Sequence, residues 1–308
     1  MARKRKGRLL DGILVLDKPQ GLSSNQALQT VKRLYGAAKA GHTGSLDPLA
    51  TGVLPLCFGE ATKFSSFLLD ADKAYTSTFV LGVTTASGDA EGDELERKSA
   101  AHISESQVQA ALEQFRGEIE QVPSMFSALK HEGQPLYKLA RAGKEVERKV
   151  RQVTVFELEL LAFREGEHPE VDVKLSCSKG TYVRSIAEDL GQALGCGAHV
   201  SALRRTKAGP FSEADMVSLT TLKALRDNEA LAEMDALLQP MDYALGDLPK
   251  VEVGEAGGFY IRQGQAVQVP NSPNSGMVRV VLETGEFLGI GEILDDGRVA
   301  PRRLVVGH

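Results

Sequence analysis

One carboxylate lies in a glycine-rich stretch that carries no other acid, Gly41-His42-Thr43-Gly44-Ser45-Leu46-Asp47-Pro48-Leu49-Ala50-Thr51-Gly52. Its glycines allow backbone angles that a Cβ atom would forbid, and Pro48 favours an extended conformation at Asp47. The stretch has no Gly-Lys-Ser/Thr end for phosphates, no Ser nucleophile elbow and no second acid for paired acid–base work. Asp47 is therefore a candidate nucleophile or general base.

A structural role for Asp47 is the alternative. An Asp beside Pro and Gly commonly caps a helix or orders a turn, and residue type and spacing alone favour that role. A functional role needs support from elsewhere in the chain.

Length and composition indicate an ordinary globular protein. The chain has 308 residues, of which 42% are hydrophobic and 25% charged, and it has no tryptophan. This length favours one large domain plus a smaller module. Cys57, Cys177 and Cys196 lack metal-ligand spacing and form no disulfide framework, so we expect no metal site and a reducing compartment. With no signal peptide or membrane-spanning apolar run in view, we expect a cytoplasmic protein.

The distribution of charge matters more than its sum. The formal net charge of −5 argues mildly against a nucleic-acid partner. Basic residues nevertheless cluster at 3–8, at 138–151 and at Arg204, Arg205 and Lys207. A basic face on an acidic protein is one reading of these clusters, and a solvated surface is the other.

The first hundred residues contain local sequence patterns that predict individual helices and strands. Residues 12–18 read as a buried strand that Pro19 stops, and Ser23 or Ser24 is placed to cap a helix that Gly36 ends. A short helix near 61–69 and a strand over 74–83 follow.

The middle of the chain mixes helices and strands without a βαβ rhythm. Ser104 and Gln107 form a capping-box pattern before a helix that ends near Gly117. Residues 171–177 alternate like a half-buried strand, and a helix follows Arg184. We predict an α+β fold with a mixed, largely antiparallel sheet flanked by helices.

Two further segments differ from the rest of the chain in amino-acid composition and pattern. The insertion, residues 122–152, is rich in Lys, Arg and Gly and is expected to lie outside the core. From about residue 248, short strand-like pieces around a helix at 255–262 suggest a small β-barrel-like module. We therefore divide the chain into domains 1–247 and 248–308.

The stretch from Gly41 to Gly52 closely resembles the active-site motif of the tRNA pseudouridine-55 synthases, the TruB family. Three further matches occur in family order: Asp17-Lys18-Pro19, Asp72-Lys73-Ala74-Tyr75 and Cys177-Ser178-Lys179-Gly180-Thr181-Tyr182-Val183-Arg184. The resemblance covers nearly the whole chain and implies the pseudouridine synthase fold, with a PUA-like RNA-binding domain at 248–308. One departure is that Thr85-Ala86-Ser87 replaces the family's frequent Thr-Asp-Thr string.

The resemblance also implies roles for individual residues. Asp47 would be the catalytic aspartate, Arg184 would pair with it and keep it ionised, and Lys18 would support the active site. The remaining implied site residues bind substrate: Tyr75 stacks on the target base, Tyr182 and Leu203 line the uridine pocket, and His42 contacts the loop and fills space left by unstacked bases. Without the resemblance, Tyr75 would read as a packing residue, Arg184 as a surface charge, and Leu203, before Arg204 and Arg205, as part of a core helix.

The implied reaction converts uridine to pseudouridine in the T stem-loop of tRNA. The base leaves C1′ through N1 and rejoins through C5, with no metal or cofactor. The uridine must be extruded from its fold, and the insertion would clamp the RNA.

Three other functions stay open at this point. They are a non-catalytic RNA-binding or tRNA-folding protein on the same scaffold, a glycoside hydrolase, which normally needs a second acid, and a guide-RNA-dependent relative. The complete motif set in one chain favours a stand-alone bacterial-type enzyme. We expect no obligate protein partner and a monomer.

Overall fold

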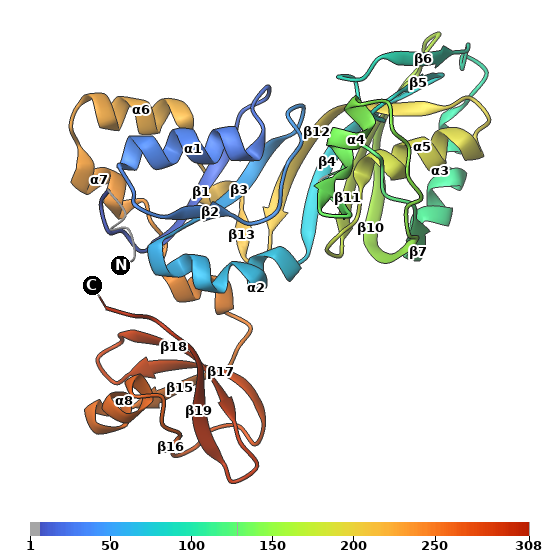
Figure 1. Ribbon diagram of the computed structural model, residues 1–308. Coiled ribbons are helices and arrows are strands. Elements are labelled where there is room, and N and C mark those ends of the chain that lie inside the picture. Colours follow the sequence, from blue (N-terminus) through green and yellow to red (C-terminus); the bar gives the residue numbers. More distant parts are fainter. Residues whose placement is uncertain (1–6, 128, 308) are drawn as a thin grey trace.

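The computed structural model describes residues 7–127 and 129–307, which form two units joined below α2 (Figure 1). Over these residues, the strands form a ten-stranded main sheet, a five-stranded C-terminal sheet and two hairpins. The main sheet has the order β14-β1-β3-β12-β4-β11-β10-β7, with β13 beside β12 and β2 beside β3. The C-terminal sheet has the order β15-β17-β18-β19-β16.

The main-sheet strands are β1 (Gly12–Lys18), β2 (Ala40–His42), β3 (Thr51–Phe58), β4 (Lys73–Leu81), β7 (Gly117–Gln121), β10 (Arg151–Arg164), β11 (Glu170–Cys177), β12 (Ala198–Ala208), β13 (Phe211–Ser212) and β14 (Val217–Ser218). The C-terminal strands are β15 (Lys250–Val253), β16 (Val267–Gln268), β17 (Gly276–Leu282), β18 (Phe287–Ile293) and β19 (Arg298–Leu304). The hairpins pair β5 (Val83–Thr85) with β6 (Glu94–Arg97), and β8 (Lys130–His131) with β9 (Gln134–Pro135).

The α-helices are α1 (Ser24–Tyr35), α2 (Ser65–Asp70), α3 (Glu105–Leu112), α4 (Leu136–Arg141), α5 (Val183–Ala193), α6 (Leu219–Asp227), α7 (Leu231–Ala236) and α8 (Glu255–Arg262). The 3₁₀ helices are η1 (Gly59–Phe64), η2 (Glu113–Phe115), η3 (Glu213–Asp215) and η4 (Met241–Leu245). The α+β prediction is confirmed, because most neighbouring strands of the main sheet run antiparallel.

The N-terminal helix forms where its local signals predict it. Ser23 caps α1 in a capping box with Gln26, and Gly36 ends the helix in the left-handed conformation. The buried face of α1 includes Val31 and Tyr35, and the Tyr35 hydroxyl donates to the Met234 carbonyl oxygen at 2.7 Å. This contact ties the helix to α7.

The α1 side of the main sheet has one hydrophobic core, and the half formed by β4, β11 and β12 has another. Side chains of β4, β11 and β12 pack there against α3 and α5, including Phe79, Val173 and Ile186. The strand predicted over 74–83 is interrupted at Gly82, which has a φ of +83°. A Cβ atom there would approach the Lys98 carbonyl oxygen to 2.3 Å, so the chain turns and β5 begins separately.

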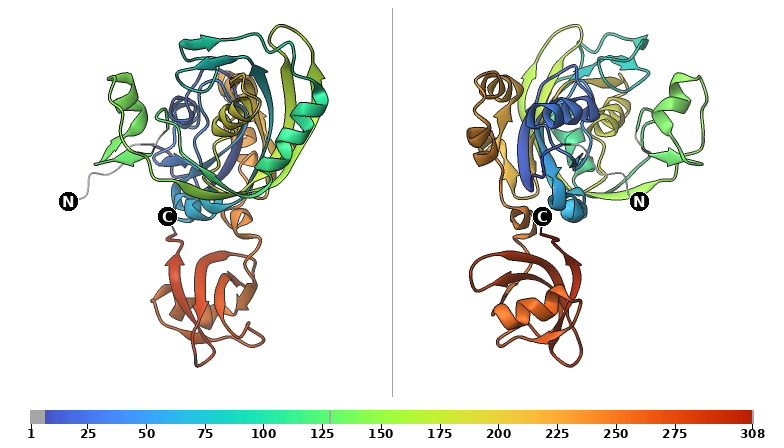
Figure 2. Two further views of the ribbon diagram at one scale, coloured as in Figure 1. Left: turned by 90° about the vertical axis from the view of Figure 1, so that its right-hand side faces the viewer. Right: turned by 60° about the vertical axis from the view of Figure 1, so that its left-hand side comes forward.

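The insertion extends away from the body of the molecule, and α4 lies apart from the main sheet and its other helices (Figure 2). Most of its described side chains are exposed or half-buried. Its last two residues, Arg151 and Gln152, instead pair with β7 in the main sheet. The side chains of these two residues are exposed, so they too lie outside the core.

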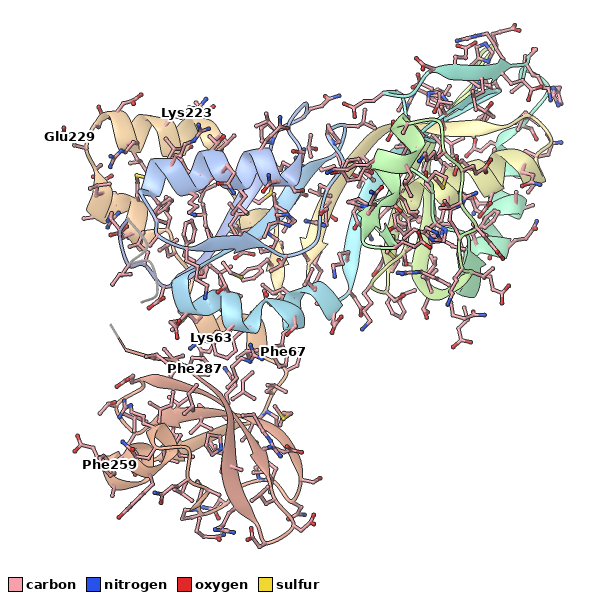
Figure 3. The ribbon with its side chains drawn as sticks, in the orientation of Figure 1. Lys63, Phe67, Lys223, Glu229, Phe259 and Phe287 are labelled. Carbon is pink, nitrogen blue, oxygen red and sulfur yellow. The ribbon has the colours of Figure 1, made fainter. Side chains whose placement is uncertain are left out.

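The C-terminal sheet is attached to η1 and α2 by apolar and polar contacts. The rings of Phe64 and Phe287 meet edge-on with centroids 5.3 Å apart, and Lys63 donates to the Leu304 carbonyl oxygen at 2.9 Å. The backbone N–H of Val306 donates to Glu60 at 2.8 Å. Figure 3 places Lys63, Phe67 and Phe287 at this junction.

All three cysteines are buried, and burial raises the pKa of Cys57 to about 12 and that of Cys177 to about 11. In the part of the chain that the structure describes, no helix is both long enough and apolar enough to cross a membrane. Most of the basic run at 3–8 lies outside the described residues.

Candidate active site

A cavity of about 400 Å³ opens between the Asp47 loop, strands β4 and β12, the start of α5 and the insertion. The residues that line it include Asp47, Tyr75, Tyr182, Arg184, Leu203, Arg205, Lys73, Ser127 and Arg151. Five of the seven predicted site residues thus meet in one hollow.

The Asp47 loop is held from below by a buried lysine. Lys18, which is fully buried at the end of β1, donates to the carbonyl oxygens of Ala50 at 2.6 Å, Pro48 at 3.4 Å and Pro19 at 2.9 Å. On the N-terminal side of Asp47, the Leu46 N–H donates to the Ser24 hydroxyl at 2.7 Å, and that hydroxyl donates to the Leu46 carbonyl oxygen at 3.0 Å. These contacts fix the backbone on both sides of Asp47.

Arg184 holds the carboxylate itself. Its Nη2 lies 3.0 Å from Asp47 Oδ2, and its side chain is only 5% exposed, against 38% for that of Asp47. The same guanidinium donates to the carbonyl oxygens of Ser87 at 2.6 Å and Phe126 at 3.2 Å, and Asp89 Oδ2 lies 3.7 Å from its Nη1. The arginine is fixed inside the protein, while the carboxylate faces the cavity.

Opposing effects act on Asp47, and their net result is a pKa above the usual range of an aspartate. Burial raises the pKa of Asp47 and nearby Asp89 raises it further, whereas Arg184 and, more weakly, Lys18 lower it. Burial lowers the pKa of Lys18 to about 8 despite the neighbouring Asp47. Arg184 makes the largest contribution to stabilising the charged carboxylate.

Aromatic and apolar side chains form the walls of the cavity. Tyr75 lies on β4 opposite Arg205 of β12. Burial raises the Tyr75 pKa, and the positive charge of Arg205 offsets part of that rise. Tyr182 immediately precedes α5. Leu203 lies on β12 and not on a helix, so the helical reading of this residue is wrong; two register shifts in β12 obscure its strand alternation.

His42 is the predicted substrate-binding residue that does not line the cavity. It lies on β2, and its buried Nδ1 has no hydrogen-bond partner among the described residues. Burial lowers its pKa, and Arg205 lowers it further. Its suggested role stays a prediction.

Sequence reasoning missed Arg205, which lines the cavity and is 1% exposed. It donates to the carbonyl oxygens of Val53 at 2.7 Å and Gly44 at 3.2 Å. The interpretation of the basic cluster Arg204, Arg205 and Lys207 as a solvated surface is therefore wrong for Arg205. The backbone of Arg205 also lies close to Gly52, where a Cβ atom would approach the Arg205 carbonyl oxygen to 2.2 Å.

Lys73 and Asp89 were not singled out as site residues either. Lys73, which is 7% exposed, donates to the carbonyl oxygens of Leu68, Leu69 and Ala71 at the end of α2, and burial lowers its pKa to about 8. Asp89, which is 4% exposed, accepts from the Ser87 hydroxyl at 2.6 Å beside Arg184. Lys73 is part of the Asp72-Lys73-Ala74-Tyr75 motif, and Asp89 follows the segment from Thr85 to Ser87 that departs from the family pattern, but neither has a role carried over from the family.

Comparisons with known proteins agree with this geometry. Residues 32–183 match the model of the TruB family pseudouridylate synthase N-terminal domain. A tRNA pseudouridine synthase B from Ectopseudomonas mendocina (strain ymp) is 58% identical over 302 residues, which cover 98% of this chain and 97% of the relative. The chain belongs to the TruB family.

Other TruB-family matches cover the rest of the chain. Residues 184–246 match a tRNA pseudouridylate synthase B C-terminal domain, and residues 249–305 match a pseudouridine synthase II TruB C-terminal domain. A tRNA pseudouridine synthase B from Coxiella burnetii (strain RSA 493 / Nine Mile phase I) is 52% identical, with 97% of this chain and 96% of the relative covered.

Solved structures share the fold of this TruB-family chain. A chain in the crystal structure of a Cbf5-Nop10-Gar1 complex has a TM-score of 0.71 and 27% identity, over 96% of this chain and 85% of that one. A chain in the structure of an H/ACA RNP bound to a substrate RNA containing 2′-deoxyuridine has a TM-score of 0.71 and 24% identity, over 100% and 92%. This second likeness concerns the fold alone.

Proposed function

We propose that Asp47 is the catalytic group with which this enzyme isomerises uridine in tRNA to pseudouridine. The reaction is that of the named tRNA pseudouridine synthase B relatives. The observation that carries the assignment is one buried arginine aiming a single carboxylate into a cavity with aromatic and apolar walls. A base detached from its sugar must be held between such walls, away from water.

The chemistry concerns the sugar as much as the base. The C1′–N1 bond breaks, the base turns and the C1′–C5 bond forms; the net change moves one proton from C5 to N1. A carboxylate beside C1′ can add to that carbon or remove the C2′ proton. A primary kinetic isotope effect with uridine deuterated at C2′ would support proton removal, and its absence would support addition.

The neighbouring side chains receive supporting roles. Tyr75 stacks on the target base, while Tyr182 and Leu203 form the rest of the pocket wall. Arg184 keeps Asp47 ionised and directed at the sugar, and Lys18 holds the backbone that carries it. We assign His42 to the space that unstacked bases leave in the RNA.

The substrate site is the T stem-loop of tRNA, at position 55. The target base must be extruded, which costs a few kcal/mol that shape and phosphate contacts can offset. The insertion supports this proposal, because it borders the cavity through Ser127 and Leu129 and is rich in Lys and Arg. We assign the catalytic part to residues 1–247 and RNA contacts to a PUA-like domain at 248–308.

We propose that the enzyme acts alone, as a monomer. The residues of all four family motifs, including Lys18, Asp47, Tyr75 and Arg184, occur within this one sequence. The comparisons give no support to the non-catalytic alternative, since the curated relatives are named as synthases.

The decisive experiment is incubation with an unmodified tRNA transcript, followed by mapping of pseudouridine. We expect product at the T-loop uridine with the unaltered protein. The Asp47→Asn variant should give no turnover and bind tRNA within an order of magnitude of the unaltered protein. A variant that keeps the original rate would refute the assignment of Asp47, and product at another uridine only would refute that of the T loop.

A further inference from the structure

Gln121 makes a two-way contact with the backbone beside the active site. It is the last residue of β7 and is 2% exposed, and its backbone is paired with Arg151 of β10. Its side-chain Oε1 accepts from the Tyr182 N–H at 2.9 Å, and its Nε2 donates to the Tyr182 carbonyl oxygen at 3.1 Å. The carboxamide thus binds Tyr182 as a neighbouring strand would.

Tyr182 needs this partner because it directly precedes α5. A residue in that position has an N–H with no acceptor inside the helix, and α5 has no side-chain cap at Tyr182. The Tyr182 carbonyl also begins the helix by accepting from the Ile186 N–H at 3.3 Å. Gln121 therefore fixes both the pocket residue Tyr182 and the place where α5 begins, two residues before Arg184.

Other bonds join the first turn of α5 to the residues that follow Gln121. Ser185 donates to the Val122 carbonyl oxygen at 3.4 Å, and Arg184 donates to that of Phe126 at 3.2 Å. We call residues 121–127 the root segment. The insertion therefore leaves the sheet through a segment bonded to the arginine that holds Asp47.

We propose that Gln121 is a positioning residue for the Asp47–Arg184 pair, and that through it the root segment couples the insertion to catalysis. This inference rests on the proposed function of Asp47. Its basis is geometric: a buried side chain with both polar atoms committed to one backbone residue cannot be shortened or made apolar without releasing that residue.

The first test is Gln121→Met, which keeps the length of the side chain but removes both hydrogen bonds. At saturating tRNA we expect kcat to fall about 10- to 100-fold, because small displacements of reacting groups have effects of that order. The tRNA dissociation constant should stay within threefold. Gln192→Met, at an exposed site on α5, serves as the matched control and should leave both constants unchanged.

A second variant and a melting curve guard against simple misfolding. Gln121→Glu keeps the acceptor for the Tyr182 N–H but loses the donor to its carbonyl oxygen, so kcat should fall here too with tRNA binding retained. The proposal is overturned if both variants keep kcat within threefold of the unaltered protein. It is also overturned if kcat and tRNA affinity fall together with a loss of folded protein.

Hydrogen exchange separates this inference from the proposed function. The Tyr182 amide should exchange faster in Gln121→Met than in the unaltered protein, whatever reaction the enzyme performs. An equal rate of Tyr182 amide exchange in the two proteins would show that the Gln121 contact does not protect this backbone. Absence of pseudouridine with the unaltered protein would instead remove the proposed function.

Discussion

The Asp47 loop and the insertion both contact Arg184, but the protein holds them in different ways. Around Asp47, the backbone carbonyls are bound by the buried side chains of Lys18 and Arg205. The described side chains of the insertion are mostly exposed or half-buried, and the bond from its described residues to Arg184 is made by the Phe126 carbonyl. The proposed reacting group is thus on the firmly bonded side of the cavity, and the proposed RNA-covering element is on the more exposed side.

This contrast indicates how one enzyme can combine precise chemistry with a large substrate. A carboxylate must stay within a fraction of an ångström of its productive position, whereas a segment that closes on RNA must open again. Arg184 is the point where the two requirements meet, because it bonds to both elements. The following variants test that division.

The largest effect is expected from Arg184→Met, which removes the side chain that both elements share. Turnover should fall by about 100-fold or more, since a preorganised charge at a reaction centre contributes on that scale. Asp47 must be ionised to act, so activity appears as pH rises through its pKa. Arg184 lowers that pKa, and its loss should therefore move the acid limb of the pH–rate profile to higher pH. An unmoved limb would contradict the assigned pairing.

Lys18→Met tests the rigid side alone. It leaves the Ala50 and Pro48 carbonyls without their buried donor, so the free energy of unfolding should fall by about 2–4 kcal/mol. Turnover should fall about tenfold among the molecules that remain folded. Denaturant unfolding and single-turnover assays measure the two effects, with exposed Lys223→Met as control. Equal stability of the two variants would count against a rigid loop.

The proposed RNA-covering side is tested by replacing exposed Lys138, Lys144 and Lys149 with Gln. The tRNA dissociation constant should rise about tenfold at moderate salt, and the slope of log K against log salt should become shallower by roughly 0.7 for each phosphate that the protein no longer neutralises. The value of kcat at saturating tRNA should stay the same, since the root segment is untouched. A lower kcat with unchanged affinity would reverse the proposed division of roles.

The smallest effect is expected from Glu145→Gln in the insertion. Its side chain is 83% exposed and lies 3.7 Å from Arg148, so the pair is screened by solvent. The free energy of unfolding should change by less than about 0.5 kcal/mol in thermal or chemical denaturation. A decrease of about 2 kcal/mol, the size of a buried hydrogen-bonding group left without its partner, would indicate that the insertion is packed as firmly as the loop.

Much of the fold was predictable where signals are local. Ser23, Gln26 and Gly36 specify both ends of α1 within the helix's own neighbourhood, and the break after Lys18 follows from Pro19. The lone Asp47 identified the candidate site, and the family motifs supplied Arg184 as its partner.

The rest depended on contacts that only the folded chain makes. Arg205 looked like a surface charge because its carbonyl partners, at Val53 and Gly44, lie far away in the sequence. The sequence does not show that Leu203 lies on a strand, because register shifts interrupt the alternation of β12. Gln121 gave no signal at all, since nothing in a sequence shows which backbone a buried amide will bind.

The three buried cysteines have a practical consequence for watching the enzyme at work. Thiol reagents attack the thiolate, and burial both shields Cys57, Cys177 and Cys196 and raises their pKa values. A single cysteine placed at an exposed site such as Lys144 should therefore take up a maleimide dye selectively in the native protein. Fluorescence from that dye would test in real time whether the insertion opens and closes on RNA, without removing any natural residue of the core.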